Sequence, residues 1–414
     1  MNYEKYSGKS VLLLGKTRSL NGVEFETLLK LHAINTVKSF DDTVALIIEG
    51  KMMNPLELQE SARLYESHEV PIVDIGAIEK WLCGSIEPNR LLMSLKLSRD
   101  QERLVNFLQN SYITDELFFK LLKLYDWQGE GLFDNDENRN VTAAIIGRFY
   151  QDLERNHNVQ YAMSGLAHLV EKYGTRELIT GISELSPIAK ELKNPNESSL
   201  KGVLDAMALH SATSESLLRV LLKERAYLLA HREPLALEQE LLALDDATIH
   251  RSLAQNSTLS PEGADLLEQK YPELIASFYP LDEVRFERLT GNSVALASNN
   301  TLTASMQERL MEMKDEAVFS ALAQNTVLSL EHLETLFALN QSAVELASNT
   351  SLSKQHLEML YQSANPEILM ALASNTSTPV EILYQLSLDQ RTERAVKTNP
   401  AFGKHIQTYN LGWN

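Results

Sequence analysis

A short basic turn near the start of the chain has the residue types needed to hold an anion. Lys16, Thr17, Arg18 and Ser19 follow an apolar run that ends at Leu14. We expect this turn to open the first helix, where unbonded backbone amides and two cations could together bind a phosphate or carboxylate. The alternative is a basic turn that is only solvated. The turn is the candidate anion contact of this sequence.

Two segments match only the end of a nucleotide-binding P-loop. Gly8-Lys9-Ser10 and Gly15-Lys16-Thr17 have the glycine-lysine-hydroxyl triplet, but Tyr3 and Ser10 stand where the loop needs its earlier glycine. Without that glycine the backbone cannot wrap around the phosphates. We therefore expect no nucleotide cofactor.

An acidic segment between residues 126 and 140 has part of a calcium-loop pattern. Asp134, Asp136 and Asn138 take its first, third and fifth places. However, Arg139 stands where the tight turn needs glycine, and Ile145 replaces the closing carboxylate. This pattern favours an exposed acidic loop, and we expect no metal site.

No residue pattern for catalysis stands out. The ten histidines are scattered, without a His-Glu-x-x-His or His-x-His pair, and there is no Gly-x-Ser-x-Gly motif. Cys83 is the only cysteine, so neither an internal disulfide nor a cysteine metal cluster can form. We expect a protein that is not an enzyme, with no catalytic residues and no cofactor. An unrecognised pocket where domains meet is the enzymatic alternative.

The charge of the chain restricts its partners. The net charge is −18, and residues 87–414 contribute 29 basic and 44 acidic side chains to it. Such a surface repels phosphate backbones and favours neutral or basic proteins, so nucleic acid is an unlikely partner. No apolar run is long enough to cross a membrane, and residues 1–10 do not resemble a signal peptide. We expect a cytoplasmic protein without a membrane partner; the sequence leaves its oligomeric state open.

The second half of the chain repeats one frame, Leu-Ala-x-Asn. The asparagines at 299, 325, 349, 375 and 399 are 26, 24, 26 and 24 residues apart. Ile275-Ala276-Ser277-Phe278 is a degraded copy that divides the longer gap after Asn256. A period of about 24 residues is typical of stacked helical units that bury their apolar faces against their neighbours. The structural repeat positions predicted by this frame are Asn256, Asn299, Asn325, Asn349, Asn375, Leu267, Leu310, Leu336, Leu360 and Leu386.

Each repeat predicts two helices. A Ser or Thr four residues after the asparagine can cap the first helix, and the leucine eleven residues after it lies on the core face. The second helix ends at the next Leu-Ala-x-Asn, where we expect asparagine to adopt the left-handed backbone. Phe319, Glu345 and Met370 stand on the second helices, where a partner could bind.

The Leu-Ala-x-Asn frame resembles the leucine-rich-repeat-variant family and its HEAT-like relatives. This resemblance implies an α-solenoid of short helical repeats over residues 209–414, ending in a C-terminal cap. Phe402, Tyr409 and Trp413 form an aromatic tail that could cover the last repeat. Residues 87–208 are expected to be helical with degenerate repeats, because Leu108 to Thr114 echoes Leu253 to Ser260. Asn194 to Ser198 is the expected break before the regular repeats.

Residues 1–86 follow a different pattern. Strand, helix, two strands, helix, strand and a short helix with Trp81 predict a small α/β sheet with helices on both faces. This order resembles the BRCT domain, an interaction module associated with phosphoproteins and DNA ends. Leu14 and Ser61 stand where phosphate-binding members have a hydroxyl and a lysine. A role in structure or protein docking is therefore favoured.

Together these features predict a mostly α protein, an α-solenoid preceded by a small α/β domain. The leading hypothesis is a non-enzymatic scaffold that binds a protein partner along the solenoid face and through the N-terminal domain. The alternative is a nucleic-acid-associated protein of DNA repair or processing, for which Arg391, Arg394 and Lys397 form a basic cluster.

Overall fold

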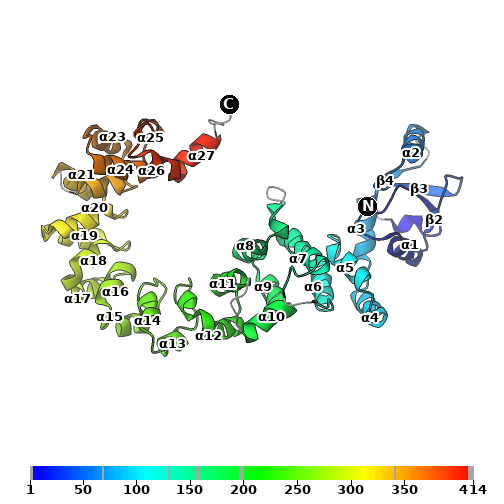
Figure 1. The fold of residues 1–414 in the computed structure, drawn as a ribbon, viewed down its shortest axis with the longest axis horizontal. Coiled ribbons are helices and arrows are strands. Elements are labelled where there is room, and N and C mark those ends of the chain that lie inside the picture. Colours follow the sequence, from blue (N-terminus) through cyan, green and yellow to red (C-terminus); the bar gives the residue numbers. More distant parts are fainter. Residues whose placement is uncertain are drawn as a thin grey trace. The chain divides into compact units, whose positions relative to one another are not determined.

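The computed structural model describes residues 3–67, 70–128, 131–153, 158–194, 200–339 and 342–408. The chain divides into two compact units, Met1–Glu224 and Arg225–Asn414. Both are mainly helical, and the first also contains a small parallel sheet (Figure 1). The division falls in α12 (Glu215–Ala230), at the non-helical backbone of Arg225. Among the described residues, no helix is both long and apolar enough to cross a bilayer.

The N-terminal sheet has the element order that the sequence predicts. Its strands pair in the order β2-β1-β3-β4, and every pairing is parallel. Helix α3 carries Trp81 and packs against α1 and β3. The elements are β1 (Ser10–Leu14), α1 (Gly22–Leu31), β2 (Asn35–Val37), β3 (Val44–Glu49), α2 (Pro55–Ser67), β4 (Ile72–Asp74) and α3 (Ile75–Gly84).

Both faces of this sheet are covered. Leu12 and Ile47 pack with Leu64 of α2 in one apolar cluster. The alternate residues Val11 and Ile48 are also fully buried, because successive strand residues point to opposite faces. Figure 1 accordingly shows α2 on one side of the sheet and α1 on the other.

The rest of the first unit is a series of irregularly spaced helices. Asparagine, threonine and aspartate side chains cap several of them, as at Thr114 before α6 and Thr175 before α9. The helices are α4 (Pro88–Ser98), α5 (Gln101–Gln109), α6 (Asp115–Leu122), α7 (Asp136–Phe149), α8 (Met163–Tyr173), α9 (Arg176–Ser183), α10 (Ser186–Lys193), α11 (Lys201–Leu209) and α12. Residues 195–198 of the expected break lie outside the described residues.

The second unit alternates between two sets of helices. The first helices are α15 (Pro261–Glu268), α17 (Glu283–Arg288), α19 (Ala304–Glu312), α21 (Leu330–Ala338), α23 (Lys354–Gln362) and α25 (Val380–Leu386). The second helices are α14 (Ala247–Ala254), α16 (Pro272–Phe278), α18 (Ser293–Ala297), α20 (Glu316–Gln324), α22 (Ala343–Ser348), α24 (Pro366–Ser374) and α26 (Glu393–Thr398). Each second helix packs on the next one along the chain. Helix α13 (Glu238–Leu242) precedes the series and α27 (Pro400–Thr408) follows it.

Caps and buried leucines explain how each first helix forms. Ser260, Thr303, Ser329 and Ser353 each accept a hydrogen bond from the amide three residues later. Helix α25 lacks such a cap, because Pro379 precedes its first residue Val380 and the Thr378 hydroxyl donates to the Leu372 carbonyl. The five repeat leucines are all buried, at 0–6% exposure: Leu267, Leu310, Leu336, Leu360 and Leu386.

The end of the second unit contains part of the predicted aromatic tail. Phe402 of α27 packs edge-on against Tyr384 of α25, with ring centroids 5.2 Å apart. Tyr409 and Trp413 lie outside the described residues. Helix α27 therefore packs at least one aromatic ring against α25, the final member of the first helices.

Candidate protein-binding surfaces

Within Arg225–Asn414, the repeat asparagines join each repeat to the repeat before it. The Nδ2 of Asn325 donates to the carbonyls of Ala297 and Asn299, both at 2.8 Å, and its Oδ1 accepts from the Val327 amide at 3.0 Å. Asn349, Asn375 and Asn399 repeat this pattern with the preceding alanine and asparagine carbonyls. A buried amide that satisfies two carbonyls and one N–H stabilises the stack, because each of those groups would otherwise be left without a partner.

The first two asparagines use different acceptors. Asn299 donates to the carbonyls of Ala276 and Tyr279, so the degraded copy supplies an acceptor one residue later than its frame predicts. Asn256 donates to Ala230 and Arg232. Carbonyl groups accept regardless of the side chain attached, which explains how these earlier frames can lack asparagine.

The predicted backbone conformation of the asparagines is wrong. Asn325 has φ −75° and ψ 120°, which is extended backbone, and Asn349 and Asn375 are alike. The left-handed residues instead follow the first helices, at Lys314 and Ala364. Asparagine is therefore required for its side chain. The recurrence of asparagine two residues after a buried Leu-Ala pair could have indicated this role.

Ion pairs link neighbouring first helices of the second unit. Arg285 of α17 pairs with Asp265 at 2.5 Å and Glu268 at 3.0 Å, both on α15. Arg309 of α19 pairs with Glu287 at 2.5 Å and lies over the ring of Phe286. The first helices also carry exposed acidic side chains, including Glu308, Glu312, Glu331, Glu334 and Glu358.

Four successive second helices, α18, α20, α22 and α24, present an uncharged surface. We call this surface the second-helix strip; it consists of the residues one and five places before Asn299, Asn325, Asn349 and Asn375, namely Val294, Ser298, Ser320, Gln324, Val344, Ser348, Met370 and Ser374. Arg251 and Arg394 occupy the corresponding places before Asn256 and Asn399, where the uncharged surface ends. Val294 and Met370 are 45% and 41% exposed. The hydroxyls of Ser298, Ser348 and Ser374 donate back to carbonyls of their own helices. The strip therefore offers methyl and thioether groups, and its serine donors do not need hydrogen-bond acceptors from a partner.

The three predicted partner-face residues do not act as one surface. Phe319 is buried, with 7% exposure, because it points into the core of its unit. Glu345 is half-buried and accepts from Ser320 of the preceding second helix at 2.9 Å. Met370 is exposed and belongs to the second-helix strip. The spacing places all three on second helices, but only Met370 is exposed.

The candidate anion contact is occupied by the protein's own carboxylate. The amides of Arg18, Ser19 and Leu20 donate to the carboxylate of Glu79, on α3, at 2.8–3.1 Å. Glu79 is fully buried. The turn also precedes α1 instead of opening it, since Asn21 caps that helix. The Lys16 amide donates to the Lys51 carbonyl, so the amides of Lys16, Arg18 and Ser19 are not available to an incoming anion.

The residue at the position of the phosphate-binding lysine is also engaged. Ser61 on α2 is buried, and its Oγ donates to Glu49 of β3. Arg63 is exposed and pairs with Glu60. Both side chains are bound within the domain, which gives no geometry for phosphate recognition at this helix.

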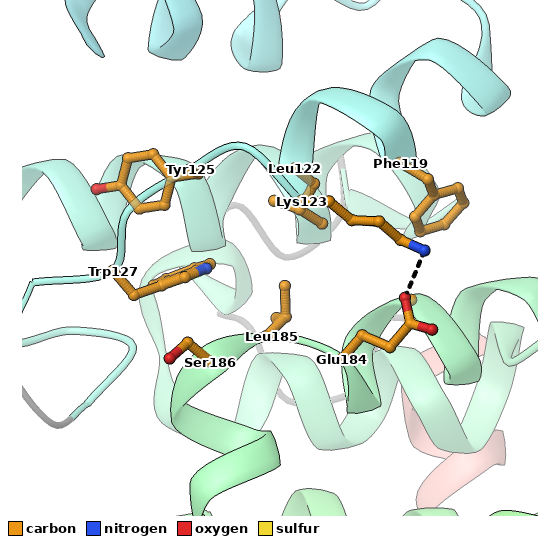
Figure 2. Close-up of a pocket in the computed structure, with 9 residues that line it drawn as sticks. Phe119, Leu122, Lys123, Tyr125, Trp127, Glu184, Leu185 and Ser186 are labelled. Atoms are coloured by element: carbon orange, nitrogen blue, oxygen red, sulfur yellow. Dashed lines mark ion pairs between the residues drawn. The ribbon is translucent and has the colours of Figure 1, made fainter. Parts of the chain in front are cut away.

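A groove lies between α6 and α9 in the first unit. Figure 2 shows the inner part, a cavity of about 100 Å³ between Phe119, Trp127 and Leu185. Lys123 and Glu184 meet across its mouth at 2.8 Å. Tyr125 and Trp127 are only 6% and 7% exposed, and their rings touch edge-on at 5.0 Å. Sequence reasoning missed this groove because its two walls are about 60 residues apart in the chain.

The remaining chemical candidates are structural. Burial raises the pKa of Cys83 to about 11, so its thiol stays protonated at neutral pH. Asn138 is buried, accepts from Tyr125 and donates to the carbonyls of Gln128 and Gly131, which organises the acidic loop. Within the described ranges, no cluster of three or more His, Cys, Asp or Glu side chains could hold a metal ion.

Comparisons with protein-family models, curated proteins and solved structures found no match. Function must therefore be inferred from the geometry of the chain itself.

Proposed function

We propose that this protein is a non-enzymatic scaffold that binds a neutral or basic protein along the second-helix strip. The observation that carries the proposal is an uncharged strip on four successive second helices, in a chain of net charge −18. Exposed Glu316 and Glu367, in the first turns of α20 and α24, border this strip. A partner with an apolar ridge and basic flanks would match both the strip and its border.

We also infer that Arg225–Asn414 is an α-solenoid of the leucine-rich-repeat-variant or HEAT-like kind. The repeated asparagine bonds and the packing of each second helix on the next support this inference. For residues 1–86, the element order and the position of Trp81 support a BRCT-like domain. Since its loop amides are bound by Glu79, docking of a protein is the role we propose for it.

The basic cluster near the C-terminus lends little support to nucleic-acid binding. Arg391 pairs with Asp389 at 2.6 Å, and Lys397 pairs with Glu393 at 2.5 Å. Each pair cancels a charge that a phosphate would need. This local neutralisation and the acidic chain favour a protein partner over DNA or RNA.

The test is a comparison of two charge insertions in affinity capture from native extract. The double variant Gln324→Lys/Ser348→Lys places cations on the strip, at helix C-termini where they are tolerated. Thr335→Lys places one on the exposed face of first helix α21 as the matched control. We expect the double variant to lose the captured protein and the control to retain it. Equal capture by both variants, with unchanged circular dichroism, would refute the strip as the binding surface.

A further inference from the structure

A polar hollow of about 530 Å³ lies in the first unit between α5, α7 and η3 (Val159–Tyr161). Helix α7 packs on both α5 and η3, so the walls of the hollow belong to one packed group of elements. Its volume is within the range of small-molecule sites in proteins. Five polar side chains that line it are Gln109, Ser111, Asn140, Gln160 and Tyr161.

These five side chains make no hydrogen bond within the described part of the chain. Other carboxamides of this protein hold the fold together. Asn138 bonds to Tyr125 and to two carbonyls of the acidic loop, and Gln307 donates to the carbonyls of Leu302 and Val327. A carboxamide presents a donor and an acceptor side by side. The hollow therefore contains three donor–acceptor pairs that the fold does not use.

The lining of the hollow is electrically neutral. Arg148 is the one charged side chain among the described lining residues, and it pairs with Asp115 at 2.7 Å. The Arg148 side chain is only 10% exposed. Its Nη1 donates one N–H to the Asn110 carbonyl at 3.3 Å, and the second Nη1 N–H has no acceptor among the described residues. The hollow therefore suits an uncharged ligand that supplies hydrogen-bond acceptors as well as donors.

Two parts of the lining suit a flat ligand. Ala143, Ala144 and Gly147 give α7 a wall without long side chains. A Cβ at Gly147 would lie 3.4 Å from the Gln160 amide oxygen, which places this carboxamide beside the wall. Tyr161 adds an aromatic ring that is 55% exposed. Exposed aromatic rings stack on the faces of planar heterocycles such as nucleobases.

We propose that this hollow binds a purine nucleoside of the adenosine type. Adenine has an amino donor next to a ring-nitrogen acceptor, the pattern that one Asn or Gln carboxamide binds with two hydrogen bonds. In this proposal Tyr161 stacks on the base, and the other carboxamides bind the ribose hydroxyls. The neutral lining favours a nucleoside over a nucleotide or a nucleic-acid strand. This inference goes beyond the proposed function, because it assigns a small-molecule site in the first unit.

The test is a ligand-observed NMR titration of the full chain with adenosine, purine riboside and ribose. Purine riboside keeps the ring system and the sugar of adenosine but lacks the amino donor. We expect saturable binding of adenosine, about tenfold weaker binding of purine riboside and no binding of ribose at about 5 mM. Absence of adenosine binding at that concentration, equal binding of the two purines, or binding of ribose as strong as that of adenosine would overturn the proposal.

Substitutions of Tyr161 locate the site. Tyr161→Ala should weaken adenosine binding about tenfold, and Tyr161→Phe, which keeps the ring, should retain it. Tyr227→Ala is the control, since Tyr227 is 52% exposed and lies outside the hollow on α12. Equal affinity of Tyr161→Ala and the original chain would place the nucleoside elsewhere and refute this site. Gln324→Lys/Ser348→Lys should leave adenosine binding unchanged, so failure of the second-helix strip and failure of the hollow are distinguishable.

Discussion

Asn110 in the first unit and Asn325 in the second form the same turn but join their surroundings differently. In both, Oδ1 accepts from the amide two residues later, and a hydroxyl residue four places later caps the next helix. The Nδ2 of Asn325 reaches two carbonyls of the preceding unit, whereas that of Asn110 donates to the sulfur of Cys83 at 3.3 Å. The turn therefore depends only on the Oδ1 bond to the amide two residues later. The Nδ2 bonds that join neighbouring repeats are independent of it.

The backbone carbonyl of Asn110 also differs from those of the repeat asparagines in the group that donates to it. In the second unit, the carbonyls of Asn299, Asn325, Asn349 and Asn375 accept from the next asparagine. In the first unit, Arg148 donates to the carbonyls of Asn110 and Ile113 and lies over the ring of Phe118. One long cation therefore does in the irregular region what a repeated amide does in the regular one. The difference explains why only the second unit shows a fixed period in its sequence.

Removing an amide from the regular region should have the largest effect. In Asn349→Ala, the Ala323 carbonyl loses its side-chain donor and the Asn325 carbonyl keeps only the Leu328 amide, and we expect a loss of about 3 kcal/mol in unfolding free energy. Hydrogen exchange should detect the loss in α20, α22 and α24. Ser348→Ala, one residue earlier and exposed, is the control and should change stability by less than about 0.5 kcal/mol. Equal effects of the two substitutions would contradict the stacking role.

The buried Cys83 thiol should make the stability of the first unit, and not that of the second, fall at alkaline pH. The folded pKa of Cys83 is about 11, above its ordinary value of 9.0, because burial disfavours the thiolate. Its contribution to stability is therefore complete below pH 9 and is lost as the pH rises towards 11, by up to about 2.5 kcal/mol. Denaturant unfolding between pH 8 and 11 should show this slope, and Cys83→Ser should flatten it. The slope would count against the assignment if it persisted in that variant.

Removing the corresponding amide from the irregular region should cost less. Asn110→Ala loses a bond to sulfur and the local turn bond, but leaves no carbonyl without its donor. We expect a loss of about 1.5 kcal/mol. Cys83 should also react faster with iodoacetamide, since its burial depends on this packing. A loss as large as that of Asn349→Ala would show that the two turns are equivalent after all.

The ion pairs of the first helices should matter least. Arg309→Gln removes the pairs with Glu283 and Glu287 and leaves a shorter, uncharged polar side chain. Because these pairs are partly exposed, we expect a loss of about 0.5 kcal/mol that disappears in high salt. Thermal melting at two salt concentrations measures this. A salt-independent loss would indicate instead that the contact with Phe286 dominates.

The sequence predicted what depends on local and periodic signals. The caps at Ser260 and Ser329, the burial of Leu310 and Leu336, and the order of strands and helices before Gly84 all follow from such signals. Glu79 could not be predicted, because it meets the turn at Arg18 from 61 residues away. The groove between α6 and α9 was missed for the same reason. Contacts between distant segments leave no period in the sequence.

The bonds between successive asparagines run in one direction along the second unit. Each side-chain amide donates to the preceding backbone, and the carbonyl of Asn399, the last in the series, accepts from Gly403 of α27. A segment cut from one asparagine to the next carries one donor set and one acceptor set, so its removal or duplication leaves no group unmatched. This protein could therefore gain or lose length by whole modules in evolution, with its terminal helix closing whichever module comes last.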